Sequence, residues 1–189
     1  MRNLSINYDV ERPLAVFDEK KLRDLITQQT LTKTPDIEIC TLVIREFRKR
    51  NLLMDKVDLI EIPWLEGVRY RVRSLKSHFV FEDKLPKNNK VYFILLTESD
   101  LDRKIRGLYV GQTFKKIERR FEEHKSGSRQ SSGVVRRRGY QVLNSITSLL
   151  PAMTKSDSKK FEQLVLRSLR GETKRKTISK LPIKWVRGA

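Results

Sequence analysis

The strongest constraint on the fold is one uninterrupted apolar run, Val91-Tyr92-Phe93-Ile94-Leu95-Leu96. A strand of this composition cannot leave one face in water, so the run predicts a strand that is covered on both faces and central in its sheet. The run is far too short to span a bilayer, which takes about 20 apolar residues as a helix. Neighbouring segments must therefore supply the other strands and the covering layers.

A second strand is predicted at Leu108-Tyr109-Val110. Because it follows the first closely along the chain, the two are expected to form an antiparallel hairpin. The pattern then predicts an exposed tyrosine at position 109, a turn at Gly111 and an amphipathic helix that ends near His124. The expected anchors of that helix lie three and four residues apart, at Phe114, Ile117 and Phe121.

Beyond this helix the chain reads as a basic loop, a third strand within 140–150 and a long final helix. Thr154 or Ser156 is expected to cap that helix, which would run to about Arg170. Residues 183–186 are expected to return as an edge strand.

The sequence pattern of the N-terminal region predicts two helices followed by a β-hairpin. Asp18 would cap a helix over 19–29, and Thr34-Pro35 would open a second helix that runs to about Leu53. The second helix would bury Ile37, Cys40, Ile44 and Phe47 and display Arg45, Arg48, Lys49 and Arg50. Strands are expected at 57–62 and 68–73, where the apolar period changes to two.

Helix, basic helix and hairpin is the order of a winged helix-turn-helix, which docks on DNA. The alternative is an α+β packing or dimerisation segment whose basic face is solvated. Residues 84–90 are polar and contain a proline, which marks a boundary. We therefore predict an N-terminal recognition or dimerisation segment at 1–86 and a catalytic domain at 87–189.

The chain carries a formal net charge of +18. Such a charge points to nucleic acid or an anionic membrane surface as partner. The positive charge is concentrated in the second half of the chain. Residues 91–189 contain 23 Lys and Arg against 9 Asp and Glu, a net charge of +14. Residues 1–90 contain 18 Lys and Arg against 14 Asp and Glu, a net charge of +4. One cysteine, Cys40, and the lack of an apolar signal segment predict a cytoplasmic protein without an intrachain disulfide.

Five residues of the second half could carry chemistry. Arg120 and His124 lie four apart on one helix face, where they could clamp a phosphate and position an oxygen, or simply be solvated. Glu162 projects from the packing side of its helix, so its carboxylate needs a metal ion or an arginine as partner. Tyr92 and Tyr109 would usually be core aromatics. They could act as bases if a strongly basic pocket lowered their pKa.

Other basic residues are candidates for contacts with nucleic-acid phosphates. They are Lys115 and Lys116 at the start of the central helix, Arg129 in the basic loop, and the run Arg136, Arg137 and Arg138. Two histidines and one cysteine cannot build a zinc site of the usual kind. His78, in the strand-like run 77–81, is read as structural.

Taken in order, these residues resemble the GIY-YIG nuclease superfamily. Val91-Tyr92 stands for the first strand motif, Tyr109-Val110-Gly111 for the second, Arg120 and His124 for the following Arg-x-x-x-His helix, and Glu162 for the later glutamate. The resemblance covers roughly 90–170. It departs from the family where Lys90-Val91 replaces Gly-Ile, and no asparagine follows the glutamate.

The resemblance implies a fold with a three-stranded antiparallel sheet flanked by helices. It also implies that the protein is a divalent-metal-dependent endonuclease that acts on double-stranded DNA. Glu162 would hold Mg²⁺, with Mn²⁺ as a substitute, and Arg120 would stabilise charge on the scissile phosphate. Tyr92 or Tyr109 would help deprotonate the attacking water, with His124 assisting.

A chain with an added non-catalytic segment fits a restriction or defence enzyme. The alternatives are a non-catalytic nucleic-acid-binding protein on the same scaffold and a structure-specific repair or recombination nuclease. Cutting both strands would take a homodimer or sequential nicking.

Overall fold

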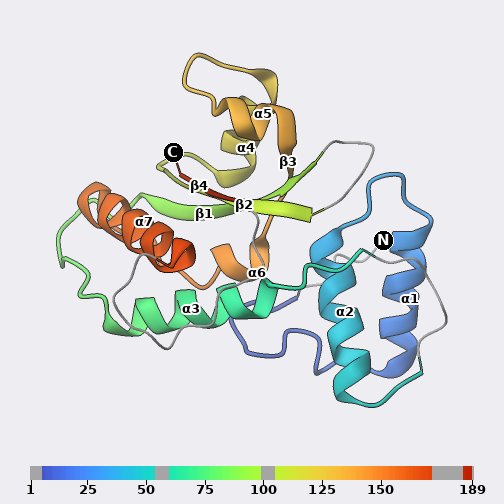
Figure 1. Ribbon diagram of the computed structural model, residues 1–189. Helices are drawn as coiled ribbons and strands as arrows, with labels where there is room; N and C mark the ends of the chain where they lie inside the picture. Colours follow the sequence, from blue (N-terminus) through green and yellow to red (C-terminus); the bar gives the residue numbers. More distant parts are fainter. Residues whose placement is uncertain (1–5, 54–59, 99–104, 172–184, 189) are drawn as a thin grey trace. The chain divides into compact units, whose positions relative to one another are not determined.

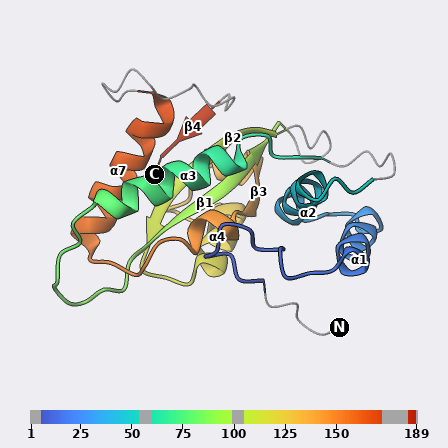
Figure 2. The ribbon, with the colours of Figure 1, turned by 90° about the horizontal axis from the view of Figure 1, so that it is seen from below.

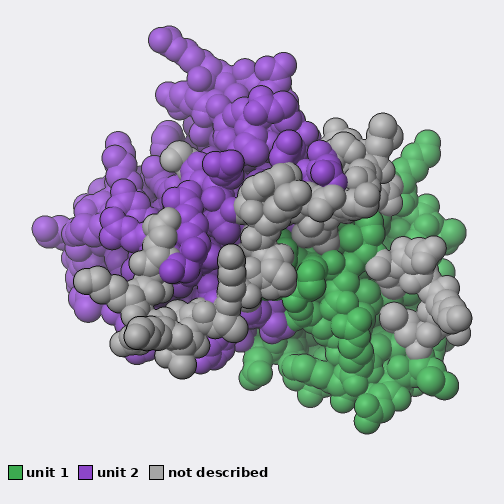
Figure 3. Space-filling model, viewed as in Figure 1, with its two compact units in different colours: residues 1–65 green, residues 66–189 purple. Residues whose placement is uncertain are grey.

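The computed structural model describes residues 6–53, 60–98, 105–171 and 185–188, and its fold is of the α+β class (Figure 1). By contacts the chain divides into two compact units, 1–65 and 66–189 (Figure 3). This division falls earlier than the predicted boundary after residue 86. The role predicted for the N-terminal segment stays a prediction.

The first unit contains the two predicted helices, α1 (Glu19–Thr30) and α2 (Ile37–Lys49). The Asp18 carboxylate accepts a hydrogen bond from the Lys21 amide at 2.8 Å, which confirms the predicted cap. The expected start of α2 is wrong, because Asp36 caps that helix through the Ile39 amide at 3.0 Å. Pro35 therefore precedes the cap, and α2 ends before Leu53.

The predicted core face of α2 is confirmed. Its members Ile37, Cys40, Ile44 and Phe47 are all buried, as are Leu22, Leu25 and Ile26 on α1. Each fully buried aliphatic or aromatic side chain contributes about 1.5–3 kcal/mol, so this pair of apolar faces is what holds α1 against α2.

Most of the arginines expected to face solvent on α2 have partners inside the first unit. Arg50 donates to the Glu46 carboxylate at 2.7 Å and to the Phe17 carbonyl at 2.7 Å. Arg12 pairs with the same carboxylate, and Arg48 pairs with Glu61 at 2.8 Å. The buried Glu46 thus joins α2 to the segment that precedes α1, and the arginine face of α2 is largely structural.

The predicted β-hairpin is wrong. Residues 68–73 lie in helix α3 (Leu65–His78), 60–62 form no strand, and 57–59 lie outside the described residues. Leu65, Val68 and Val72 are fully buried at helical spacing, so the alternation read as a strand is one face of a helix. His78, the last residue of α3, is exposed and lies in no strand. The order of elements predicted for a winged helix-turn-helix is therefore wrong, because a helix takes the place of the second strand of the hairpin.

The second unit is built on a four-stranded sheet with the order β3-β1-β2-β4. The strands are β1 (Lys90–Thr97), β2 (Ile105–Thr113), β3 (Gly139–Val142) and β4 (Trp185–Arg187). The predicted interior position of β1 and its antiparallel pairing with β2 are confirmed. Of the edge strand predicted at 183–186, residues 183–184 lie outside the described residues, and β4 forms an edge strand from Trp185. Because β4 pairs parallel with β2, the sheet is mixed rather than three-stranded and antiparallel.

Helices cover both faces of this sheet (Figures 1 and 2). On one face lie α4 (Ile117–Ser126) and α5 (Gly133–Arg138), and on the other lie α6 (Asn144–Thr147) and α7 (Lys155–Arg170). Thr154 caps α7 by accepting from the Asp157 amide at 3.0 Å, as predicted. None of the described helices combines the length and apolar character that a bilayer crossing demands.

Candidate active site

The hairpin register places the two tyrosines on one face of the sheet. Tyr92 pairs with Gly111, and Ile94 pairs with Tyr109, so the tyrosines are diagonal neighbours whose ring centroids lie 6.1 Å apart. Both are buried, which confirms their interpretation as core aromatics and contradicts the exposure that the strand pattern suggested for Tyr109. Gly111 lies within β2 rather than in a turn. A Cβ atom built there would lie 2.7 Å from the Tyr92 hydroxyl oxygen, so this position requires glycine.

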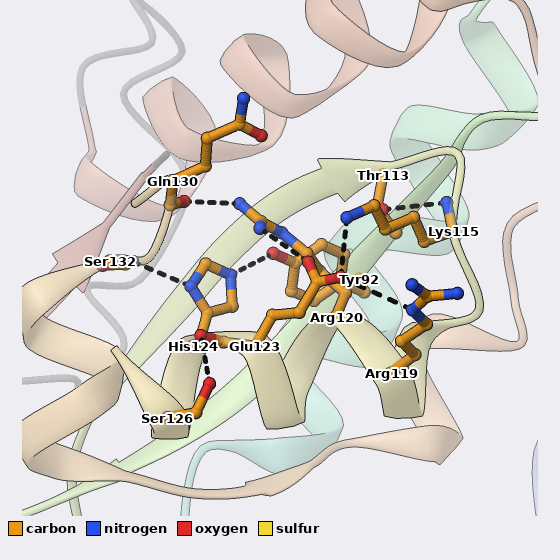
Figure 4. A network of polar contacts seen from close by, with 10 residues as sticks. All are labelled: Tyr92, Thr113, Lys115, Arg119, Arg120, Glu123, His124, Ser126, Gln130 and Ser132. Atoms are coloured by element: carbon orange, nitrogen blue, oxygen red, sulfur yellow. Dashed lines mark hydrogen bonds and ion pairs between the residues drawn. The ribbon is translucent and has the colours of Figure 1, made fainter. Parts of the chain in front are cut away.

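His124 on α4 is buried, and its ring lies against those of both tyrosines. Figure 4 shows its contact with Tyr92. Its Nε2 atom lies 2.8 Å from the Tyr92 hydroxyl oxygen, and its Nδ1 atom accepts a hydrogen bond from the Ser132 amide at 2.8 Å. Because a backbone amide can only donate, Nδ1 carries no proton. A neutral His124 therefore donates Nε2–H to Tyr92.

The imidazole stays neutral at physiological pH. Burial, helped by the nearby positive charge of Arg120, lowers the pKa of His124 to about 4. A neutral ring with both nitrogens engaged is suited to orienting the Tyr92 hydroxyl. It is not suited to donating a proton as imidazolium.

Arg120 lies one helical turn before His124 and on the same side of α4. Its guanidinium donates to the Gln130 carbonyl at 2.8 Å and to the Glu123 carboxylate at 3.2 Å. The side chain of Arg120 is 15% exposed, against 75% for the neighbouring Arg119. Of the two arginines, Arg120 is therefore the one held beside the tyrosines.

The environment of the tyrosines differs from the one that the sequence suggested. Burial raises the pKa of Tyr92, and the positive charge of Arg120 only partly opposes that rise. Burial also raises the pKa of Tyr109, and the negative charge of Glu162 adds to it. Both side chains are neutral phenols at pH 7. The expectation that the basic surroundings lower these pKa values is wrong for the protein alone.

Glu123 is the member of this cluster that the sequence interpretation missed. Its carboxylate binds Lys115 at 2.6 Å as well as Arg120, and these contacts lower its pKa, with the Lys115 hydrogen bond the largest cause. The signal was present in the sequence. Glu123 follows Arg119 by four residues and Arg120 by three, the spacings at which helical side chains meet. Lys115, predicted to contact phosphate, is thus already in an ion pair.

Glu162 lies on the packing side of α7, as predicted, and is 7% exposed. A Cβ atom built on Gly188 would lie 3.6 Å from its Oε1 atom, so the chain just after β4 covers this carboxylate. No group of three or more His, Cys, Asp or Glu side chains gathers within the described ranges. The donor set fits the mode in which Mg²⁺ keeps most of its waters and binds one carboxylate together with a substrate phosphate.

The remaining predicted contacts surround α4 and α5. Lys116, Arg129, Arg136 and Arg137 are exposed, and Arg138 is half-buried. Lys116 is the residue that precedes α4, and the Arg136 guanidinium lies over Gly127, the left-handed residue that ends α4. Their contact with nucleic acid stays a prediction.

A cleft of about 680 Å³ opens next to the cluster. Its walls are formed by the segment that precedes β1, by the end of β2 with the residues that follow it, and by the start of α7. Arg120 and Lys115 lie in its lining, so the cleft reaches the edge of the cluster. Phe114, predicted to anchor α4, instead lines this cleft and is 69% exposed. Ile117 and Phe121 do pack against the tyrosine cluster.

Comparisons of the chain with known protein families, with curated proteins and with solved structures find no match.

Proposed function

We propose that this protein is a divalent-metal-dependent DNA endonuclease of the GIY-YIG kind. The observation that carries the proposal is the contact of 2.8 Å between the Tyr92 hydroxyl and His124 Nε2, with Arg120 held beside the same ring. Tyrosine, histidine and arginine come from segments that are separate in the sequence. Their meeting at one buried point of a basic domain supports a site that acts on an anionic substrate such as a phosphodiester.

Each residue of the cluster has a role in phosphodiester hydrolysis. Arg120 offers a fixed cation for the charge that develops on the phosphate, an electrostatic contribution that is usually large. His124 holds the Tyr92 hydroxyl through Nε2–H, and Tyr92 or Tyr109 positions the attacking water. Because both phenols are neutral in the free protein, one of them becomes a base only when added positive charge lowers its pKa.

Glu162 is the residue that would hold the metal ion in this proposal. Bound Mg²⁺, or Mn²⁺ in its place, supplies positive charge that polarises the phosphate and favours loss of a proton from a nearby hydroxyl. The negative charge of Glu162 reaches Tyr109, which supports a shared site.

The partner proposed for this site is double-stranded DNA. The net charge of +14 in 91–189 supports a polyanion, and binding would weaken steeply with salt. This proposal also includes a biological role in restriction or defence, a cytoplasmic location and a homodimer that cuts both strands.

The test is plasmid cleavage in Mg²⁺ by the Glu162→Ala variant. We expect the variant to lose cleavage while its affinity for DNA stays within about twofold, because Glu162 is 7% exposed and contributes no positive charge to the binding of phosphates. Glu122→Ala removes an exposed carboxylate on α4 and is expected to cleave normally. Full cleavage by Glu162→Ala would refute the assignment.

A second candidate is a nucleic-acid-binding protein that keeps this scaffold without catalysis. The raised pKa values of both tyrosines favour it, because neither phenol is a base in the free protein. Tight, salt-sensitive binding without cleavage in Mg²⁺ or Mn²⁺ would support this candidate. The third, a structure-specific repair or recombination nuclease, predicts faster cutting of branched or flapped DNA than of plain duplex.

A further inference from the structure

The cleft beside the cluster has the composition of a nucleotide subsite. Lys84 and Lys155 are exposed lysines in its lining, and neither makes an ion pair with another described residue. Its volume of about 680 Å³ lies inside the range of roughly 300–1,000 Å³ typical of sites for small molecules and cofactors. A cleft of this size can hold an unstacked nucleotide, but a duplex could only lie across it.

Phe114 supplies the aromatic surface of the cleft. It lies between the end of β2 and the start of α4 and is 69% exposed. A single exposed aromatic residue is common on protein surfaces and by itself carries nothing. Here, however, the ring shares its cleft with Lys84, Lys115 and Lys155. An aromatic face among cations is the arrangement on which nucleic-acid bases stack while the backbone phosphates are held.

The walls of the cleft are fixed by tertiary contacts. Asn89 and Met153 exchange two backbone hydrogen bonds of 3.0 and 2.8 Å, which join the segment before β1 to the segment before α7. The Glu82 amide donates to the Asp157 carboxylate at 2.9 Å, and Lys160 pairs with Glu82 at 3.0 Å. The cleft is therefore formed before any ligand binds, which lowers the entropic cost of binding.

Polar side chains that can contact a base edge also line the cleft. Asn88, Asn89, Gln112 and Gln130 are among the residues that line the cleft. The Asn89 side-chain amide donates to the Asn88 side-chain oxygen at 2.9 Å, and the Gln112 side-chain oxygen accepts from the Ser158 hydroxyl at 3.3 Å, so these three amides keep part of their hydrogen-bonding capacity for a ligand. An amide can donate and accept hydrogen bonds at the edge of an unpaired base, whereas in a duplex that edge is already paired.

We propose that this cleft binds one unpaired nucleotide of a DNA strand, with the base stacked on Phe114 and the flanking phosphates held by Lys84 and Lys155. The substrate class is then DNA with a single-stranded segment next to the cut. Only the claim that the bound strand is cut at this site rests on the proposed function. That claim is made because Arg120 lines both the cleft and the tyrosine cluster. Binding of the strand needs no catalysis.

The experiment measures binding by the full chain in EDTA, so that cleavage plays no part. The probe is a fluorescein-labelled oligo-dT of about ten nucleotides, within the site sizes of single-strand-binding proteins. A blunt duplex of equal length is the reference probe. We expect Phe114→Ala to weaken binding of the single strand by about tenfold or more and binding of the duplex by less than twofold.

Matched variants isolate the two parts of the proposed cleft. Tyr70→Ala removes a 74% exposed aromatic residue on α3, outside the cleft, and is expected to bind like wild type. Phe114→Trp should restore binding, because indole also stacks. Lys155→Ala should lower the salt slope of single-strand binding by about 0.7, whereas Lys159→Ala, exposed on the same helix, should not.

A photocrosslink provides a direct readout. An oligonucleotide with 5-iododeoxyuridine should crosslink within the peptide that contains Phe114. The proposal is overturned if the chain does not bind the single strand, if Phe114→Ala loses no more affinity than Tyr70→Ala, if the duplex loses as much as the single strand, or if the crosslink falls elsewhere. Single-strand binding that depends on Phe114, without cleavage in Mg²⁺ of either a plasmid or a duplex that carries a single-stranded gap or flap, would support the cleft and refute the nuclease.

Discussion

The two units of this protein use arginine in different ways. In the first unit, Arg12 and Arg50 bind the buried Glu46, and Arg48 binds Glu61, so the cations serve the fold. In the second unit, Arg120 is held by Glu123 and by the Gln130 carbonyl at the edge of a cleft, beside two buried tyrosines. A basic helix therefore does not by itself mark a DNA-binding surface. What matters is whether the carboxylates and carbonyls of the same unit already hold its cations.

The sharpest test of this contrast is Arg120→Ala. We expect cleavage to fall by about 10²–10³-fold, because a preorganised cation beside the reacting phosphate would be lost. Arg119→Ala removes a cation that is 75% exposed and one residue away, and is expected to cleave within a few-fold of wild type. Equal losses in the two variants, measured by plasmid cleavage, would mean that α4 contributes only general charge.

Glu46→Ala tests the structural side of the comparison. Removing the buried carboxylate takes the anionic partner from both Arg12 and Arg50, so we expect the free energy of unfolding of the first unit to fall by about 2–4 kcal/mol. Urea unfolding followed by Trp64 fluorescence in a Trp185→Phe background reports on this unit. DNA affinity should be unchanged. A large loss of affinity with little loss of stability would reverse the roles given to the two units.

His124 gives the second unit a pH dependence of its own. Its pKa is near 4 in the folded protein and near 6.5 when unfolded, so the unfolded chain takes up the proton first as pH falls. The stability that the neutral ring contributes is present above pH 6.5 and is lost as pH falls toward 4, by about 3 kcal/mol. His124→Gln should lack this part of the acid sensitivity in urea titrations across the window. Identical pH profiles would contradict the buried neutral imidazole.

The smallest effect is expected on the exposed face of α2. Arg48→Ala removes a 65% exposed arginine, and the free energy of unfolding should change by less than about 0.5 kcal/mol. DNA affinity, measured by fluorescence anisotropy, should stay within twofold, because a structural face makes no phosphate contact. A drop of tenfold or more would revive the interpretation of α2 as a recognition helix.

Local patterns predicted the elements whose signals lie within a few residues. The apolar run 91–96 had to become a buried central strand, and Thr154 was in place to cap α7. The same kind of pattern failed at 68–73, because Val68 and Val72 suit a strand face and a helix face equally well. Neighbouring Leu65 decides for the helix, because all three are buried at helical spacing.

Within the candidate site, the sequence predicted the members but not their states. Tyr92, Tyr109, Arg120 and His124 could be chosen from order and spacing, and the fold brings them together. That the tyrosines are buried, with raised pKa values, depends on α4 and α5 closing over the sheet. Glu123 could have been predicted from its helical spacing to Arg119 and Arg120. The hydrogen bond from the Ser132 amide could not have been predicted, because this amide comes from a loop whose position depends on the whole domain.

Composition and short-range periodicity were enough to predict the central strand, the strong charge of the second half and the order of the candidate residues. The parallel β4, the neutral tautomer of His124 and the cleft that displays Phe114 follow from the three-dimensional fold alone. Each of these depends on contacts between residues far apart in the chain, and no local pattern encodes the register in which such segments meet.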